Sequence, residues 1–83
     1  MDRQDIVDTV RNFVLTQFLP GEDPDELAND TPLMTTGILD SLATLKLVTF
    51  LEQEFEITVE AHEADAENLN TIDHIVDLVN AKL

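Results

Sequence analysis

The sequence predicts an all-α bundle of three longer helices and one short helix, with a long loop between the first two helices. Three segments repeat apolar residues at the three- and four-residue spacing of amphipathic helices. The single strand-like stretch, residues 57–59, is too short to pair with anything nearby. At 83 residues, the chain is expected to form one domain, residues 1–83, with a modest core.

The first helix is predicted to begin after Asp2, which is a good N-cap residue, and to end before Pro20 and Gly21. Its apolar residues form one stripe at helical spacing, which indicates one buried face. The stripe consists of Ile6, Val7, Val10, Phe13, Val14 and Phe18.

Residues 20–40 form an unusually long connection that is rich in proline, glycine and acidic residues. Loops of this length in small domains are usually functional or disordered. Leu27, Leu33, Ile38 and Leu39 are spaced along it, and we expect them to pin an ordered loop to the core. A short helical turn is expected near residues 24–28.

The second helix is predicted to start at Asp40 or Ser41 and to run to about Phe55. Its apolar residues cover most of the helix circumference, which such a small domain cannot bury completely. We therefore expect a partly exposed apolar strip beside Ser41. The apolar residues are Leu42, Ala43, Leu45, Leu47, Val48, Phe50, Leu51 and Phe55.

The C-terminal part predicts a connector at residues 57–59, a weak helix over residues 60–67 and a final helix. Asn70 is a good N-cap for that helix, and Asp73 at the third helical position approaches a capping box. The predicted apolar stripe consists of Ile72, Ile75, Val76, Val79 and Leu83.

The composition is strongly acidic, with 18 Asp and Glu against 4 Lys and Arg and a net charge of -14. Such a field repels nucleic acid and anionic membranes and attracts basic protein surfaces. The chain has no Cys, which excludes disulfides, thiolate metal sites and a thiol nucleophile. Neither a signal-peptide pattern nor a membrane-span pattern is present, so we expect a soluble, cytoplasmic protein.

Ser41, in the stretch GILDSL, is the residue most worth testing for chemistry. His62 and His74 are the only histidines, and nothing in the sequence around either one indicates that its imidazole reaches Ser41. The Gly-x-Ser-x-Gly turn that exposes the nucleophile of hydrolases is also missing. The acidic loop fails the calcium-loop spacing, and no phosphate-binding loop is present. We therefore expect no catalytic residue and no metal site, and a protein that is not an enzyme.

Modification of Ser41 fits its position better than catalysis does. A helix N-terminus stabilises an attached phosphate, and Asp40 places a carboxylate next to it. The run GILDSLATLKLVTFLEQEFEI resembles the signature of the acyl carrier protein family, in which an Asp-Ser-Leu step opens the second helix. The resemblance implies the four-helix acyl-carrier-type bundle and a 4′-phosphopantetheine, derived from coenzyme A, on Ser41. The alternative is that Ser41 is an ordinary N-cap.

The second helix departs from the carriers of fatty acid synthesis, which typically show a run of acidic residues on its exposed side. Two, five and twelve residues after Ser41 stand Ala43, Lys46 and Gln53. The predicted partner-facing strip is therefore less acidic. It consists of Leu42, Ala43, Lys46, Thr49 and Gln53.

This stretch looks more like discrete carriers such as the D-alanyl and aminoacyl carrier proteins. The resemblance implies three kinds of partner: a phosphopantetheinyl transferase, an adenylating acyl or amino acid ligase, and a downstream acyltransferase or synthase. We expect a monomer that holds acyl or aminoacyl groups as thioesters. A cargo pocket would lie between the second and third helices, near Leu45, Val48, Ile57 and Leu69. A fatty acid synthesis carrier and an acidic protein-interaction module remain the alternatives.

Overall fold

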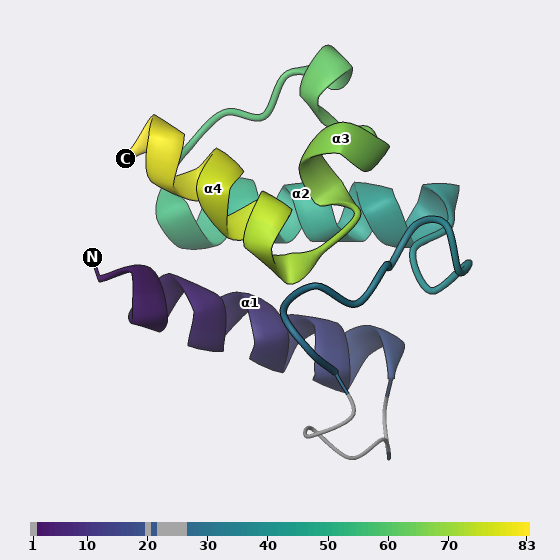
Figure 1. Cartoon of the computed structure of the whole chain (residues 1–83). Helices are drawn as coiled ribbons and strands as arrows, with labels where there is room; N and C mark the ends of the chain where they lie inside the picture. The colour runs from purple at the N-terminus through teal and green to yellow at the C-terminus, as the bar shows by residue number, and fades with distance from the viewer. Residues whose placement is uncertain (1, 20, 22–26) are drawn as a thin grey trace.

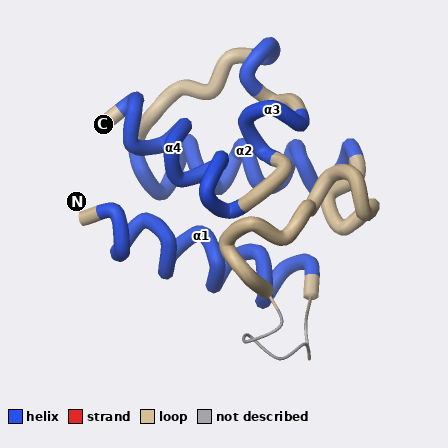
Figure 2. Tube along the Cα trace, in the orientation of Figure 1, coloured by secondary structure: helices blue, strands red, loops and turns tan. Residues whose placement is uncertain are grey.

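The computed structural model describes residues 2–19, 21 and 27–83, and all the regular structure in these residues is helical (Figures 1 and 2). The elements are α1 (Arg3–Phe18), α2 (Ser41–Phe55), the 3₁₀ turn η2 (Ala61–Glu63), α3 (Ala66–Leu69) and α4 (Ile72–Lys82). α4 packs on both α1 and α3, and the two termini lie at the same end of the molecule (Figure 1). The predicted fold class, three longer helices and one short helix with a long loop after the first, is confirmed.

One hydrophobic core joins the helices and the long loop. From α1 it takes Ile6, Val7, Val10 and Val14, whereas Phe13 and Phe18 are only half-buried at its edge. The remaining buried side chains come mainly from the long loop, α2, α3 and α4. Because all these segments share one core, the small domain is held together without disulfides. They include Leu33, Leu47, Leu51, Leu69, Ile72, Ile75, Val76 and Val79, all with no exposed surface.

The long loop is pinned as the sequence predicts. Leu27, Leu33 and Leu39 are buried in the core, and Ile38 is half-buried against it. The helical turn expected at residues 24–28 lies mostly outside the described residues, as does Pro20 as the helix stop. α1 ends at Phe18.

Hydrogen bonds add to this apolar anchoring of the loop. The Arg11 guanidinium donates to the Leu27 carbonyl oxygen and to Asn29 Oδ1. The backbone N–H of Asp73, at the start of α4, donates to the Asn29 carbonyl oxygen over 3.0 Å. The loop is thereby tied to α1 on one side and to α4 on the other.

The start of α4 differs from the sequence prediction. Thr71, and not Asn70, is the N-cap, because Thr71 Oγ1 accepts the His74 backbone N–H over 3.0 Å. Asn70 instead turns its side chain to the long loop. At the C-terminal end of α4, Leu83 was predicted to belong to the buried apolar stripe but is 56% exposed. Leu78, which the prediction left out, is buried.

The weak helix expected over residues 60–67 is divided into two short turns. At η2 the Glu60 backbone N–H donates to Glu63 Oε1 over 2.9 Å, and Asp65 starts α3 by accepting the Asn68 backbone N–H. The extended backbone of Asp65, at φ -133° and ψ 178°, separates η2 from α3 and interrupts a continuous helix. Lys82 Nζ lies 2.8 Å from Glu63 Oε1, which joins η2 to the end of α4.

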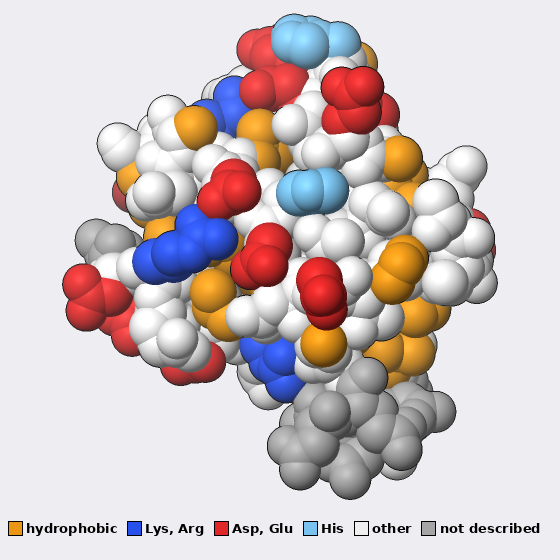
Figure 3. All heavy atoms as spheres, in the orientation of Figure 1, with side chains coloured by type: hydrophobic (Ala, Val, Ile, Leu, Met, Phe, Trp, Pro, Cys, Tyr) orange, Lys and Arg blue, Asp and Glu red, His pale blue; other side chains and the backbone are white. Residues whose placement is uncertain are grey.

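Acidic side chains are spread over the face of the molecule drawn in Figure 3, with few basic ones between them. One of the basic residues, Arg3, links the start of α1 to α4: its guanidinium lies 2.7 Å from Asp77 Oδ1 and 3.7 Å from Asp73 Oδ1. Within the described residues no helix combines the length and the apolar character that a membrane crossing requires.

Candidate functional site

Ser41 is the first residue of α2 and is exposed. The residue before it does the capping: Asp40 Oδ1 accepts the Ala43 backbone N–H over 2.8 Å, and the Asp40 carbonyl oxygen accepts the Thr44 N–H. The Ser41 hydroxyl makes no hydrogen bond to any described residue. Ser41 is therefore not the N-cap, and its hydroxyl is left available at the helix start.

The turn that presents Ser41 is built by the loop before it. Leu39 is buried, and its backbone N–H donates to the Leu33 carbonyl oxygen over 2.8 Å. Between them Gly37 adopts φ 84°, a left-handed conformation that favours glycine. Burial of the leucine on each side of this turn sets the direction in which the chain enters α2.

Asn70 holds the same turn from the α3–α4 junction. Its side-chain Oδ1 accepts the backbone N–H groups of Met34 and Thr35, over 2.9 and 3.2 Å, and its carbonyl oxygen accepts that of Leu33. Sequence reasoning missed this residue, because an Asn before a helix is ordinarily interpreted as its N-cap.

A hollow of about 450 Å³ opens beside Ser41. Its lining combines apolar side chains with the two residues of the Asp-Ser step and a second hydroxyl residue, Thr44. The lining residues are Met34, Leu39, Asp40, Ser41, Thr44 and Ala64.

Thr44 is the unusual member of this lining. It is 8% exposed, and its Oγ1 atom is buried without a hydrogen-bond partner. Thr49, in the same helix, donates its hydroxyl to the Leu45 carbonyl oxygen over 3.0 Å. An unpartnered buried hydroxyl costs stability and calls for an explanation.

The residues predicted to line a cargo pocket do not line this hollow. Leu69 is fully buried in the core, and Val48 and Ile57 are half-buried against it. Leu45 is 61% exposed and lines a different hollow, between α2 and α1. Helical periodicity placed Leu45 on an apolar face without showing which neighbour that face meets.

The predicted partner-facing strip is exposed except at one position. Leu42 is 62% exposed, and Lys46, Thr49 and Gln53 are also exposed. Ala43 is buried in the core beneath the strip, because its position on α2 faces inward. Exposed Leu42, together with Leu45, confirms the expected apolar strip beside Ser41.

The two histidines lie on the surface. Both His62 and His74 are exposed, and no hydrogen bond joins either side chain to Ser41 in the described part of the chain. Nor do three or more His, Asp or Glu side chains gather as metal ligands in the described residues.

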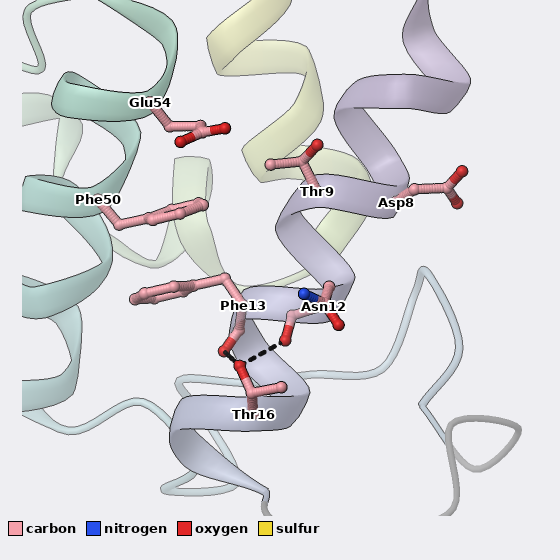
Figure 4. A pocket seen from close by; sticks show the side chains of 7 residues that line it. All are labelled: Asp8, Thr9, Asn12, Phe13, Thr16, Phe50 and Glu54. Carbon is pink, nitrogen blue, oxygen red and sulfur yellow. Dashed lines mark hydrogen bonds between the residues drawn. The ribbon is translucent and has the colours of Figure 1, made fainter.

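A third hollow, of about 440 Å³, lies between α1 and α2 away from Ser41 and does not include Leu45 (Figure 4). The Phe13 and Phe50 rings stack in it with centroids 4.0 Å apart, and Glu54 lies above the pair in this view. Ser41 is not among its lining residues. The ring stack holds α1 and α2 together at the edge of the core.

The geometry of Ser41 can be compared with known proteins. Residues 18–79 match the family model described as the phosphopantetheine attachment site. The chain belongs to this family. The cofactor of this carrier protein is therefore 4′-phosphopantetheine. The membership of the acyl carrier protein family that GILDSL predicted is confirmed.

Two curated relatives support the same assignment. The carrier is 41% identical over 68 residues to the probable acyl carrier protein PigG of Serratia sp., covering 82% of this chain and 77% of the relative. It is 36% identical over 72 residues to a D-alanyl carrier protein of Streptococcus suis, covering 87% of each. The chain is thus an acyl or aminoacyl carrier protein, and the two alternatives predicted from sequence are not favoured.

A solved structure shares the fold. One chain of a crystal structure described as that of an FAD-dependent dehydrogenase superposes with a TM-score of 0.76 at 30% sequence identity. The match covers 84% of the carrier and 97% of that chain, so the matched chain is also small.

Proposed function

We propose that Ser41 is the residue that bears 4′-phosphopantetheine in this carrier. The observation that carries the proposal is that capping and exposure at the start of α2 belong to two different residues. Asp40 supplies the cap, and the exposed Ser41 hydroxyl has no structural partner in the described residues. Ser41 is also the only serine of the chain, so no second serine competes for the role.

The electrostatics of α2 support an attached phosphate at this point. The helix dipole and the unpaired N–H groups of the first turn favour an anion there. The first turn of α2 contains no acidic residue, although the chain has a net charge of -14. The acidic first-turn residues of α1 and α4, Asp5 and Asp73, have no counterpart in α2.

The attachment step needs an enzyme and one nucleophilic oxygen of this chain. Ser41 Oγ forms a bond to the phosphorus that carries the pantetheine of coenzyme A, its proton passes to a base, and the phosphorus–oxygen bond to the nucleotide breaks. A phosphopantetheinyl transferase supplies the catalysis. In our proposal Asp40 positions Ser41 by fixing the first turn of α2.

The prosthetic group supplies the thiol on which acyl groups are held as thioesters, a group that the Cys-free chain does not have. We propose an amino acid or a short acyl group as cargo, loaded by an adenylating ligase in the cytoplasm and then delivered to an acyltransferase or synthase. The similarity to a D-alanyl carrier protein supports this class of cargo. The similarity to a chain of the FAD-dependent dehydrogenase structure adds a dehydrogenase of that kind as a downstream partner to test.

The carrier itself acts as a monomeric, cofactor-bearing substrate in this proposal, and its partners perform the chemistry.

The hollow beside Ser41 supports a short cargo with a polar end. Met34 and Leu39 offer apolar contact, and the unpartnered Thr44 hydroxyl offers a hydrogen bond.

Intact-protein mass spectrometry tests the attachment site. The chain is incubated with coenzyme A and a broad-specificity phosphopantetheinyl transferase, beside Ser41→Ala and the matched control Thr35→Ala. Thr35 is an exposed hydroxyl residue in the turn before Ser41. We expect a gain of one phosphopantetheine on the wild type and on Thr35→Ala only. A gain on Ser41→Ala, or no gain on a folded wild type, refutes the assignment.

Loading is tested on the phosphopantetheinylated protein with an adenylating ligase from a D-alanyl carrier system, ATP and one amino acid or short acid at a time. A mass gain that hydroxylamine removes identifies a thioester. Loading of long-chain acyl groups alone, by an acyl transfer enzyme of fatty acid synthesis, would contradict the proposed cargo class.

A further inference from the structure

A groove runs between α1 and α2, with Asp40 at one end. It consists of two hollows of about 250 and 410 Å³ that share Gln17 and Lys46 in their linings. We call it the α1–α2 groove. Its main lining residues are Phe13, Gln17, Phe18, Leu42, Lys46 and Phe50.

The floor of the groove is apolar and well packed. The Phe13 ring stacks on Phe50 with centroids 4.0 Å apart and meets Phe18 edge-on at 5.5 Å. Leu42 and Leu45, 62% and 61% exposed, each line one of the two hollows. Large exposed apolar side chains gathered at one groove indicate a surface that binds another protein.

The residues that line the groove carry no net charge, one Lys against one Asp, whereas the whole chain has a net charge of -14. Lys46 is exposed and has no ion-pair partner among the described residues, whereas Arg3 and Lys82 are paired with acidic side chains. Among the residues that line the groove, Asp40 is the one acid, and one of its oxygens is occupied by the Ala43 N–H. An unpaired ammonium beside exposed leucines is complementary to a carboxylate on an apolar surface.

We propose that the α1–α2 groove docks a partner enzyme that inserts an apolar side chain beside Leu42 and Leu45 and places a carboxylate on Lys46. The inference rests on the proposed carrier function and names the surface that selects the partner. The docking surface thus includes the C-terminal half of α1, through Phe13 and Gln17, as well as α2.

The charge outside the groove sets a second requirement on the partner. A net charge of -14 repels a uniformly acidic surface before contact. The partner carboxylate must therefore stand alone within a basic surround. A uniformly basic patch would meet Lys46 as a like charge, which is the kind of unfavourable contact that excludes wrong partners.

Two synthetic helical peptides of identical composition and identical net positive charge serve as probes. Both present a pair of leucines one turn apart. In the first, a single Glu lies next to the leucine pair, and in the second the same Glu lies on the opposite face. Each peptide is titrated into the ¹⁵N-labelled chain carrying Ser41→Ala, and the amide shifts of the groove residues are followed.

The first peptide should shift the amides of Gln17, Lys46 and Phe50. It should bind about fivefold more tightly than the second peptide, the factor that corresponds to one solvent-accessible ion pair at the upper end of its range. Lys46→Gln should remove this advantage. Asn80→Asp, which lowers the net charge by the same one unit at an exposed position of α4, should preserve it.

Equal affinity of the two peptides, shifts confined to other surfaces, or an advantage that survives Lys46→Gln would each overturn the docking proposal. Because the measurement uses Ser41→Ala protein, these outcomes leave the attachment of phosphopantetheine to Ser41 untouched. Failure of the mass-spectrometric test would likewise leave the peptide result standing.

Discussion

Thr44 has a buried hydroxyl whose energetic cost can be estimated from the structure. The residue is 8% exposed, and Oγ1 has no hydrogen-bond partner. A polar group buried in this way costs about 1–3 kcal/mol of stability. We predict that Thr44→Val, which keeps the branched shape and replaces the hydroxyl with a methyl group, raises the free energy of unfolding by about 1 kcal/mol. We take the low end of the range because Thr44 borders the open hollow beside Ser41.

Thr49→Val is the matched control in the same helix. Thr49 is exposed, and its hydroxyl donates to the Leu45 carbonyl oxygen. Both substitutions exchange Thr for Val inside α2, so the change in intrinsic helix propensity is the same and small. We expect Thr49→Val to change the free energy of unfolding by less than about 0.5 kcal/mol in either direction.

Urea and thermal unfolding followed by circular dichroism measure the difference, since the chain has no Trp or Tyr for fluorescence. Salt near 0.15 M shortens the range of the repulsion between acidic residues to about 8 Å. A gain of 1 kcal/mol corresponds to a melting temperature about 4–8 °C higher in a domain of this size. If Thr44→Val instead lowers stability relative to Thr49→Val, the hydroxyl has a partner in solution and the reasoning is wrong.

Three further predictions concern the groups that hold the loop, the start of α2 and η2. Asn70→Leu removes the acceptor of two loop N–H groups and should lower the free energy of unfolding by about 1–3 kcal/mol, whereas Asn70→Asp keeps an acceptor oxygen and should lose less. Asp40→Ala removes the N-cap of α2 and should cost about 1 kcal/mol in the same urea assay. The hydrogen bond from Lys82 lowers the pKa of Glu63 below its usual 4.5, so their pair stabilises the fold above that pH and the stabilisation is lost as the pH falls through the lowered pKa. Unfolding midpoints of wild type and Lys82→Gln, measured from neutral to acidic pH, should therefore differ at neutral pH and converge in acid.

Each of these predictions has an outcome that contradicts it. Equal losses for Asn70→Leu and Asn70→Asp would mean that the side-chain acceptor does not hold the loop. An Asp40→Ala variant as stable as the wild type would place the cap on another residue, with Ser41 the first to examine. A stability difference between wild type and Lys82→Gln that persists unchanged at low pH would show that Lys82 acts through packing and not through Glu63.

Local sequence features were sufficient for α1 and α2 and for the position of Ser41 at the start of α2. The period of apolar residues is a property of neighbouring residues, so α1 and α2 could be predicted, with α2 ending at Phe55 as expected. Asp40 before Ser41 marked the helix start, and the spaced leucines of the loop predicted its burial. The resemblance of GILDSL to carrier proteins rested on the same short run.

Residues with more than one plausible local role were harder to predict. Asn70 and Thr71 are both good caps, and the sequence favoured the first. In the folded chain Thr71 caps α4, because the Asn70 side chain is taken by the N–H groups of Met34 and Thr35. A partner about 35 positions away in the chain leaves no local signal.

The sequence alone determined the fold class, the helix that presents Ser41 and the apolar character of the strip beside it. Only the tertiary structure decided which sides of α2 meet α1, the loop or solvent. It buried Ala43, exposed Leu45, left Lys46 without an ion pair in the described residues and left the Thr44 hydroxyl unpartnered. The reason is physical: helical periodicity sets the angle between side chains on one helix, whereas burial and pairing depend on neighbours brought together from distant parts of the chain.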